Sequence, residues 1–76
     1  RLAEVLLKLY EQFGTNEEDF LNIPLTREEL ANLVGTATES VIRMLSQLKS
    51  QQMIGLKGRK IKIIDTDKLR KISEQF

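Results

Sequence analysis

The sequence predicts a mostly α-helical fold of three to four helices with one small β-hairpin. Three observations support this fold class. Two short apolar patterns with helical spacing are separated by Gly35. Residues 53–64 change to the alternating pattern of two short strands joined at Gly58 and Arg59. Amphipathic helical patterns also open and close the chain, which has 76 residues and therefore forms one small domain.

The first thirteen residues predict an amphipathic helix that ends at Gly14. Glu4 and Lys8 are four residues apart on its polar side, where they form a favourable charge pair. We expect one apolar stripe along the other side, formed by Leu2, Val5, Leu6, Leu9 and Phe13.

A polar, acidic stretch at residues 15–19 follows and predicts a solvated loop, because its carboxylates lack the spacing of an EF-hand calcium site. Residues 20–24 predict a short strand or an extended lead-in. Pro24 limits any strand there to a short or edge strand, since proline cannot donate a ladder hydrogen bond.

Two capping-box patterns lie ten residues apart in the middle of the chain. Thr26 and Glu29 form the first, at the start of one predicted helix, and Thr36 and Glu39 form the second. Gly35 stands between them, where a helix ends in a left-handed conformation. The two apolar stripes are Leu30, Ala31 and Val34, then Val41, Met44, Leu45 and Leu48. Two short helices with this hinge predict a helix-turn-helix over about residues 26–51.

The second of these helices has a polar face opposite its apolar stripe. Side chains of this kind at the start of a helix contact base edges in the DNA major groove. The alternative is an ordinary pair of helices with a solvated polar face. The face consists of Thr38, Glu39, Ile42, Arg43, Ser46 and Gln47.

The predicted hairpin at about residues 53–64 has a basic tip and follows directly, which makes it a wing. We expect its Lys57, Arg59 and Lys60 to lie against phosphates, where charge adds affinity without base identity. The same lysines also protect a hairpin edge from pairing with other chains, and both roles are compatible. Residues 26–64 carry a net charge of +4 and residues 1–25 a net charge of −3, an asymmetry typical of a nucleic-acid face with an acidic back.

The composition excludes several kinds of site. The chain has no Cys and no His, so Ser–His or Cys–His catalysis and ordinary zinc sites are excluded from within it. We therefore predict no catalytic residue, no metal ligand and no enzyme activity. No apolar run approaches the roughly 20 residues of a membrane span. The chain begins with Arg1 directly on a helical pattern, and we expect a cytoplasmic protein of which these residues are one piece.

The central segment resembles the DNA-binding domain of the bacterial Crp/Fnr transcription regulators. Those proteins share the pattern V/L-G-x-x-x-E-T/S-V-x-R-x-L, which this chain matches in VGTATESVIRML. The preceding LTREELANL and the following MIGLKGRKIKI stand in family order. The resemblance covers nearly the whole chain and implies a winged helix-turn-helix domain over residues 1–76, the carboxy-terminal piece of such a regulator.

The resemblance implies which residues contact bases. Residues matching Glu39 and Arg43 reach base edges in the family, where arginine suits guanine and glutamate accepts from the cytosine amino group. Thr38 stands at a further base-contacting position that is arginine in some members, so a different base preference is expected there. Ile42 stands where small residues are common; it packs on a thymine methyl, is simply exposed, or contacts another domain.

Other positions match family residues near phosphates. These are Thr26, Arg27 and Ser40, to which the wing adds Lys57 and Arg59. Thr26 also has the role of a helix cap, and Ser40 has the competing role of an ordinary first-turn residue. Arg27 is the strongest phosphate candidate of the first three.

The partners implied by the resemblance belong to the whole regulator. They are a near-palindromic double-stranded DNA operator bound by a homodimer, and RNA polymerase, with no membrane. We expect no cofactor in this domain, because an effector such as a cyclic nucleotide binds an amino-terminal domain in the family. The alternative function is a winged-helix protein–protein interaction module that does not bind DNA, since folds are reused without their function.

Overall fold

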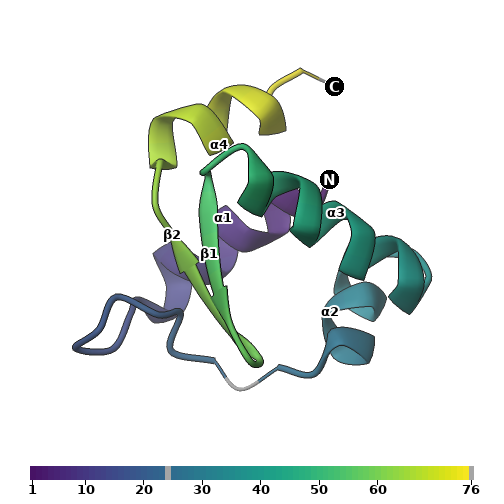
Figure 1. The fold of residues 1–76 in the computed structure, drawn as a ribbon, viewed down its shortest axis with the longest axis horizontal. Coiled ribbons are helices and arrows are strands. Elements are labelled where there is room, and N and C mark those ends of the chain that lie inside the picture. The colour runs from purple at the N-terminus through teal and green to yellow at the C-terminus, as the bar shows by residue number, and fades with distance from the viewer. Residues whose placement is uncertain (24, 76) are drawn as a thin grey trace.

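The computed structural model describes residues 1–23 and 25–75, which form four helices and one antiparallel hairpin (Figure 1). In chain order the elements are α1 (Leu2–Phe13), α2 (Arg27–Val34), α3 (Thr38–Ser50), β1 (Ile54–Lys57), β2 (Lys60–Ile63) and α4 (Thr66–Ser73). The predicted fold class is confirmed: α2 and α3 form the helix-turn-helix, and the β1–β2 hairpin is the wing. The expectation for Pro24 concerns a residue outside those described.

Helix α1 ends at Gly14 as predicted, and Leu2, Val5, Leu6 and Leu9 of the predicted stripe lie in or against the core, but the buried face is broader than that stripe and omits Phe13. Ala3 and Leu7 are buried, whereas Phe13 is 51% exposed. The reason is that α4 packs along α1 and covers the side that carries Ala3 and Leu7. The predicted Glu4–Lys8 pair is present, with 3.8 Å between Oε1 and Nζ.

The first capping box and the glycine hinge are confirmed. The Glu29 amide donates to Thr26 Oγ1 at 3.0 Å, and the Thr26 amide donates to Glu29 Oε1 at 2.9 Å. Gly35 adopts the left-handed conformation, with φ 86° and ψ 38°. This conformation lets the Gly35 and Thr36 amides both donate to the Ala31 carbonyl, which closes the end of α2.

The second predicted capping box, between Thr36 and Glu39, is wrong. Helix α3 starts one residue later than expected, with Ala37 as its N-cap in an extended conformation. The Thr36 amide is used to close α2, so Thr36 lies before the N-cap and Glu39 falls at the second helical position rather than the third. No side chain among the described residues caps the start of α3.

The wing is a short hairpin with a two-residue turn at Gly58 and Arg59, as predicted. Lys57 pairs with Lys60 across this turn. A positive φ of 60° at Gly58 fits the type II′ turn, whose twist matches that of the strands.

The segment before α2 adds one bridge to the wing rather than a further strand element. Phe20 pairs with Lys62, and the Leu21 amide donates to the Ile61 carbonyl at 2.7 Å. The Lys62 ammonium lies 4.7 Å from the centre of the Phe20 ring and the Lys60 ammonium 5.7 Å, both within cation–π range. The outer edge of β2 is therefore partly covered.

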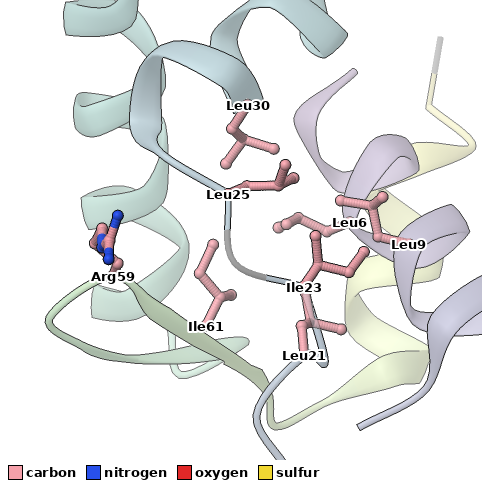
Figure 2. Close-up of a pocket in the computed structure, with 8 residues that line it drawn as sticks. All are labelled: Leu6, Leu9, Leu21, Ile23, Leu25, Leu30, Arg59 and Ile61. Carbon is pink, nitrogen blue, oxygen red and sulfur yellow. The ribbon is translucent and has the colours of Figure 1, made fainter.

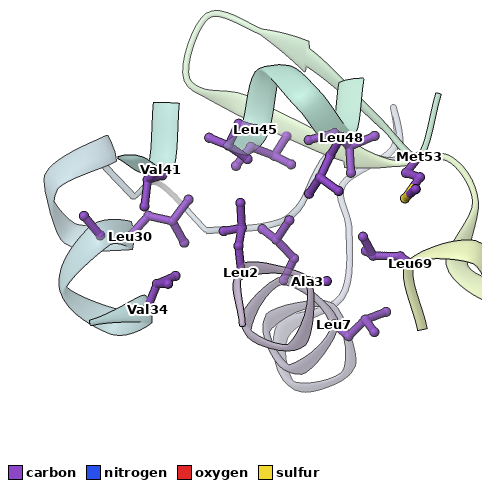
Figure 3. Packing of buried hydrophobic residues seen from close by; sticks show 14 residues of the cluster. Leu2, Ala3, Leu7, Leu30, Val34, Val41, Leu45, Leu48, Met53 and Leu69 are labelled. Atoms are coloured by element: carbon purple, nitrogen blue, oxygen red, sulfur yellow. The ribbon is translucent and has the colours of Figure 1, made fainter. Parts of the chain in front are cut away.

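One hydrophobic core joins all four helices and the wing (Figure 3). The stripes predicted for α2 and α3 are buried, with Met44 at the margin. Helix α4 is capped by Asp65, which accepts from the Lys68 amide at 2.9 Å, and it inserts the fully buried Leu69. The core comprises Leu2, Ala3, Leu6, Leu7, Leu30, Ala31, Val34, Val41, Leu45, Leu48, Met53, Ile54, Ile61 and Leu69.

Candidate nucleic-acid interface

Helix α3 presents a largely polar, exposed face because its apolar residues other than Ile42 turn inward. Val41 and Leu45 are 0% and 1% exposed, so the opposite face is free of the core. Ile42 is 52% exposed and lies on that outer face, next in sequence to the exposed Arg43. The predicted base-contacting residues therefore share the accessible side: Glu39, Ile42 and Arg43 are exposed, and Thr38 is partly buried.

The start of α3 offers backbone donors because it lacks a side-chain cap. The Ser40 and Val41 amides both donate to the Ala37 carbonyl, which occupies the later amides of the first turn. The first amides of a helix carry partial positive charge and bind anionic oxygens such as phosphates. Ser40 itself is partly buried in this first turn.

The wing concentrates positive charge that no carboxylate of the described residues neutralises within ion-pair distance. Lys57, Arg59 and Lys60 are all exposed. Lys57 and Lys60 are also direct cross-strand partners. Like charges that face each other across a hairpin destabilise it. An anion placed between them would relieve that repulsion.

Arg27 joins the helix-turn-helix to the tip of the wing. Its Nη2 donates to the Gly58 carbonyl at 3.2 Å and its Nη1 to the Arg59 carbonyl at 3.3 Å. Partial burial lowers the pKa of Arg27 from its ordinary value. Sequence reasoning placed Arg27 near phosphates and missed this contact, because its partners lie 31 and 32 residues away and leave no local pattern.

Glu29 lies near the same turn. Its hydrogen bonds with the backbone and the hydroxyl of Thr26 lower the pKa of Glu29, and the positive charge of Arg59 lowers it further. Three of the predicted phosphate residues, Thr26, Arg27 and Arg59, are thus brought together at the start of α2. The capping box uses both groups of Thr26, because its amide donates to Glu29 Oε1 and its hydroxyl oxygen accepts from the Glu29 amide.

Arg1 forms a second contact that the sequence did not indicate. Its Nε donates to the Val34 carbonyl at 2.9 Å, across 33 residues. Carbonyls in the last turn of a helix lack intrahelical partners, and basic side chains satisfy them. Helix α1 is therefore fastened to the end of α2 just before the hinge.

An apolar crevice lies where α1, α2 and the wing meet, and Leu21, Ile23 and Leu25 also line it (Figure 2). Leucine and isoleucine side chains converge on it, and Arg59 lies at its outer edge. Its volume is about 10 Å³, the limit for a single water and far below a small-molecule site of roughly 300–1,000 Å³. The crevice is a packing seam that holds the wing against the helices. It is not a cofactor site.

The described residues contain no group of His, Cys, Asp and Glu side chains that could hold a metal ion. Nor is any helix in residues 1–23 and 25–75 long and apolar enough to cross a membrane.

A helix-turn-helix with an exposed polar second helix, followed by a basic hairpin, defines a winged helix-turn-helix protein. Residues 1–72 match the model of the Crp-like helix-turn-helix domain, and the chain belongs to that family. Its relatives are transcription regulators rather than enzymes.

Three curated relatives illustrate the match. The CRP-like cAMP-activated global transcriptional regulator of Mycobacterium tuberculosis is 38% identical over 71 residues, covering 91% of this chain and 32% of the relative. The cAMP-activated global transcriptional regulator CRP of Salmonella typhimurium is 34% identical over 67 residues, covering 87% of this chain and 32% of the relative. The transcriptional activator protein FnrL of Cereibacter sphaeroides is 39% identical over 71 residues, covering 93% of this chain and 27% of the relative. The chain spans about a third of the length of these relatives.

Solved structures agree on the fold. The CO-dependent transcription factor CooA from Carboxydothermus hydrogenoformans superposes with a TM-score of 0.84 at 27% identity, covering 97% of this chain and 35% of that one. FixK2 from Bradyrhizobium japonicum superposes with a TM-score of 0.79 at 27% identity, covering 92% of this chain and 35% of that one.

Proposed function

We propose that this domain binds double-stranded DNA in a sequence-specific manner as the DNA-binding part of a bacterial transcription regulator. Helix α3 enters the major groove and the wing lies along the phosphate backbone. The observation that carries the proposal is the exposed face of α3, where Glu39 and Arg43 stand opposite a fully buried stripe. A helix inserted into the major groove needs this division between a base-facing and a core-facing side.

The base contacts follow from the chemistry of that face. Arg43 donates two hydrogen bonds to a guanine, and Glu39 accepts from a cytosine amino group. Ile42 packs on a thymine methyl, and Thr38 completes the group at the start of the helix. Each good contact of this type contributes about 1–3 kcal/mol of discrimination against the wrong base.

The phosphate contacts set the affinity. Lys57 and Arg59 contact the backbone from the wing, where a phosphate also relieves the Lys57–Lys60 repulsion. The uncapped start of α3, together with Ser40, offers N–H and hydroxyl donors to a second phosphate. The Thr26 hydroxyl offers a third contact from the start of α2.

The remaining partners belong to a longer regulator. We propose that it binds a near-palindromic operator as a homodimer and acts on RNA polymerase. The relatives from Mycobacterium tuberculosis and Salmonella typhimurium are cAMP-activated. An effector of this protein, a cyclic nucleotide or another small molecule, would bind outside the residues of this chain.

The test is fluorescence anisotropy of the 76-residue chain on a pool of labelled duplexes at two salt concentrations. We expect the binding to depend on salt concentration. We expect Arg43→Ala to lower the discrimination between the right and the wrong base at one base pair by about 1–3 kcal/mol of binding free energy. Lys57→Ala should weaken binding to all duplexes alike. It should also lower the magnitude of the salt slope, which is the slope of log affinity against log salt concentration, by about 0.9. Arg70→Ala and Lys68→Ala are the matched controls, because both side chains are exposed on α4.

Absence of binding to every duplex at low salt would contradict the proposal. It would leave the winged-helix protein-interaction module as the function to test, with the exposed face of α3 probed against protein partners. Binding that Arg43→Ala weakens equally on all duplexes would instead contradict only the assignment of Arg43 to a base.

A further inference from the structure

The contact between Arg27 and the wing turn connects two parts of the proposed interface that are far apart in sequence. The guanidinium donates to the carbonyls of Gly58 and Arg59, the two residues of the turn itself. Both bonds are at the long end of the hydrogen-bond range, so each is individually modest. Together they use the planar fork of the guanidinium on two successive carbonyls, which a single ammonium cannot do.

The capping box at the start of α2 fixes the position of the Arg27 backbone. Arg27 is the first helical residue of α2, directly after the N-cap Thr26. The side chain is also partly buried, and that desolvation lowers its pKa. The wing occupies two of the five N–H donors of the guanidinium.

Glu29, the capping-box partner of Thr26, also lies near the wing turn. Its hydrogen bonds with Thr26 are the main cause of its lowered pKa, and the positive charge of Arg59 lowers the pKa further without forming an ion pair. The two hydrogen bonds of Arg27 therefore hold the tip of the wing against the start of α2, and Arg59 also lines the crevice that Leu25 and Leu30 share.

We infer that Arg27 is a positioning residue: it fixes the wing turn on the helix-turn-helix so that Lys57 and Arg59 meet the phosphates in the correct register. This inference rests on the proposed DNA binding and revises the expectation that Arg27 contacts phosphate directly. Arg27 acts on DNA through the wing. Its own charge is the less important part of its role.

The discriminating variant is Arg27→Lys, which keeps the positive charge and loses the fork. Arg70→Lys is the matched control, since Arg70 is an exposed arginine whose partner Glu11 lies on α1 rather than at the wing. The first measurement is ¹⁵N relaxation of the Gly58 and Arg59 amides in the free chain. We expect both amides to become more mobile in Arg27→Lys and in Arg27→Ala, and to be unchanged in Arg70→Lys.

The second measurement is DNA affinity against salt concentration on the preferred duplex. For Arg27→Lys we expect a roughly threefold to tenfold loss, the worth of one or two modest hydrogen bonds. The salt slope should fall although the charge is retained, because the wing contacts to phosphate are impaired. Arg59→Ala should cost less in the Arg27→Lys background than in the unsubstituted chain, since the two residues act as one unit.

A different set of results would overturn the inference. If Arg27→Lys binds DNA with unchanged affinity and salt slope while Arg27→Ala loses about 0.9 of the slope, Arg27 is a direct phosphate contact. Unchanged relaxation of the wing turn in both variants would also overturn it. The relaxation experiment needs no DNA, so a failure of the proposed DNA binding is distinguishable from a failure of the wing contact.

Discussion

Glu29 combines two roles in one carboxylate, since it completes the cap of α2 and faces the charge of Arg59. Its hydrogen bonds to Thr26 lower its pKa in the folded chain. A lowered folded pKa means that ionised Glu29 stabilises the fold above its unfolded pKa of about 4.3. That stabilisation is lost as the pH falls through the folded pKa.

The prediction concerns Glu29→Gln, which removes the charge and keeps the shape. At neutral pH the variant should melt at a lower temperature than the unsubstituted chain, and the difference should disappear below the folded pKa of Glu29. Thermal unfolding followed by circular dichroism between pH 2 and pH 7 measures this. Glu28→Gln is the matched control, because it removes a carboxylate from the same turn without changing the capping box. A melting difference that is constant over this pH range would contradict the prediction.

At this scale the sequence predicts what is local. The capping box of Thr26 and Glu29 spans three residues, and Gly35 follows an apolar stripe, so both are visible as patterns. The two hydrogen bonds of Arg27 cross more than thirty residues. Nothing in the local sequence marks Gly58 and Arg59 as its partners, because every residue of the chain carries a backbone carbonyl.

At the scale of the elements, α3 starts on an alanine where helices prefer Ser, Thr, Asp or Asn. Ala37 already has the extended conformation of an N-cap, with φ −75° and ψ 151°. A capping side chain would therefore fit without moving the backbone. The start of the proposed recognition helix gives up stability and keeps its N–H groups open to DNA.

Two substitutions test this exchange. Ala37→Ser and Ala37→Asp should each stabilise the fold by about 1 kcal/mol, measured by urea unfolding. Ala37→Asp should in addition weaken DNA binding, because it places a negative charge where a phosphate is expected. Ala37→Val, which cannot cap, is the control for stability. If Ala37→Asp binds DNA as tightly as Ala37→Ser, the start of α3 does not face a phosphate.

The pattern of Thr36 and Glu39 misled the prediction at this scale for a physical reason. Two consecutive motifs compete for the residue between them, and the closing turn of α2 uses the Thr36 amide. In a sequence, a capping box is recognised only from the spacing of its two residues. That spacing does not show that the end of the preceding helix already uses the amide of Thr36. The wing had no such competitor, and its turn at Gly58 was predicted correctly.

At the scale of the whole molecule, the first and last helices complete one core. Leu69 is 0% exposed and belongs to the same cluster as Leu7 of α1 (Figure 3). Helical periodicity predicted an apolar face on both helices. It could not show that α4 packs on α1, and so it left Ala3 and Leu7 off the buried side of α1 and put Phe13 on it.

We predict that Leu69→Ala lowers the free energy of unfolding by about 2–5 kcal/mol, because it removes a fully buried side chain and leaves a cavity. In a domain of this size each kcal/mol corresponds to roughly 4–8 °C in melting temperature. Leu33→Ala, which truncates a leucine that is 50% exposed on α2, is the matched control and should change the melting temperature little. Equal effects of the two substitutions would show that α4 does not contribute to the core as described.

The packing of α4 on α1 has a consequence for how the domain is made. A ribosome adds roughly 5–20 residues per second, so the α1 leucines are synthesised several seconds before Leu69 can cover them. The turn between α2 and α3 and the hairpin depend on neighbours in sequence and can form during that interval. Of the elements described, α4 is synthesised last, so we expect a nascent chain that stalls before Leu69 to expose the apolar face of α1 that α4 covers.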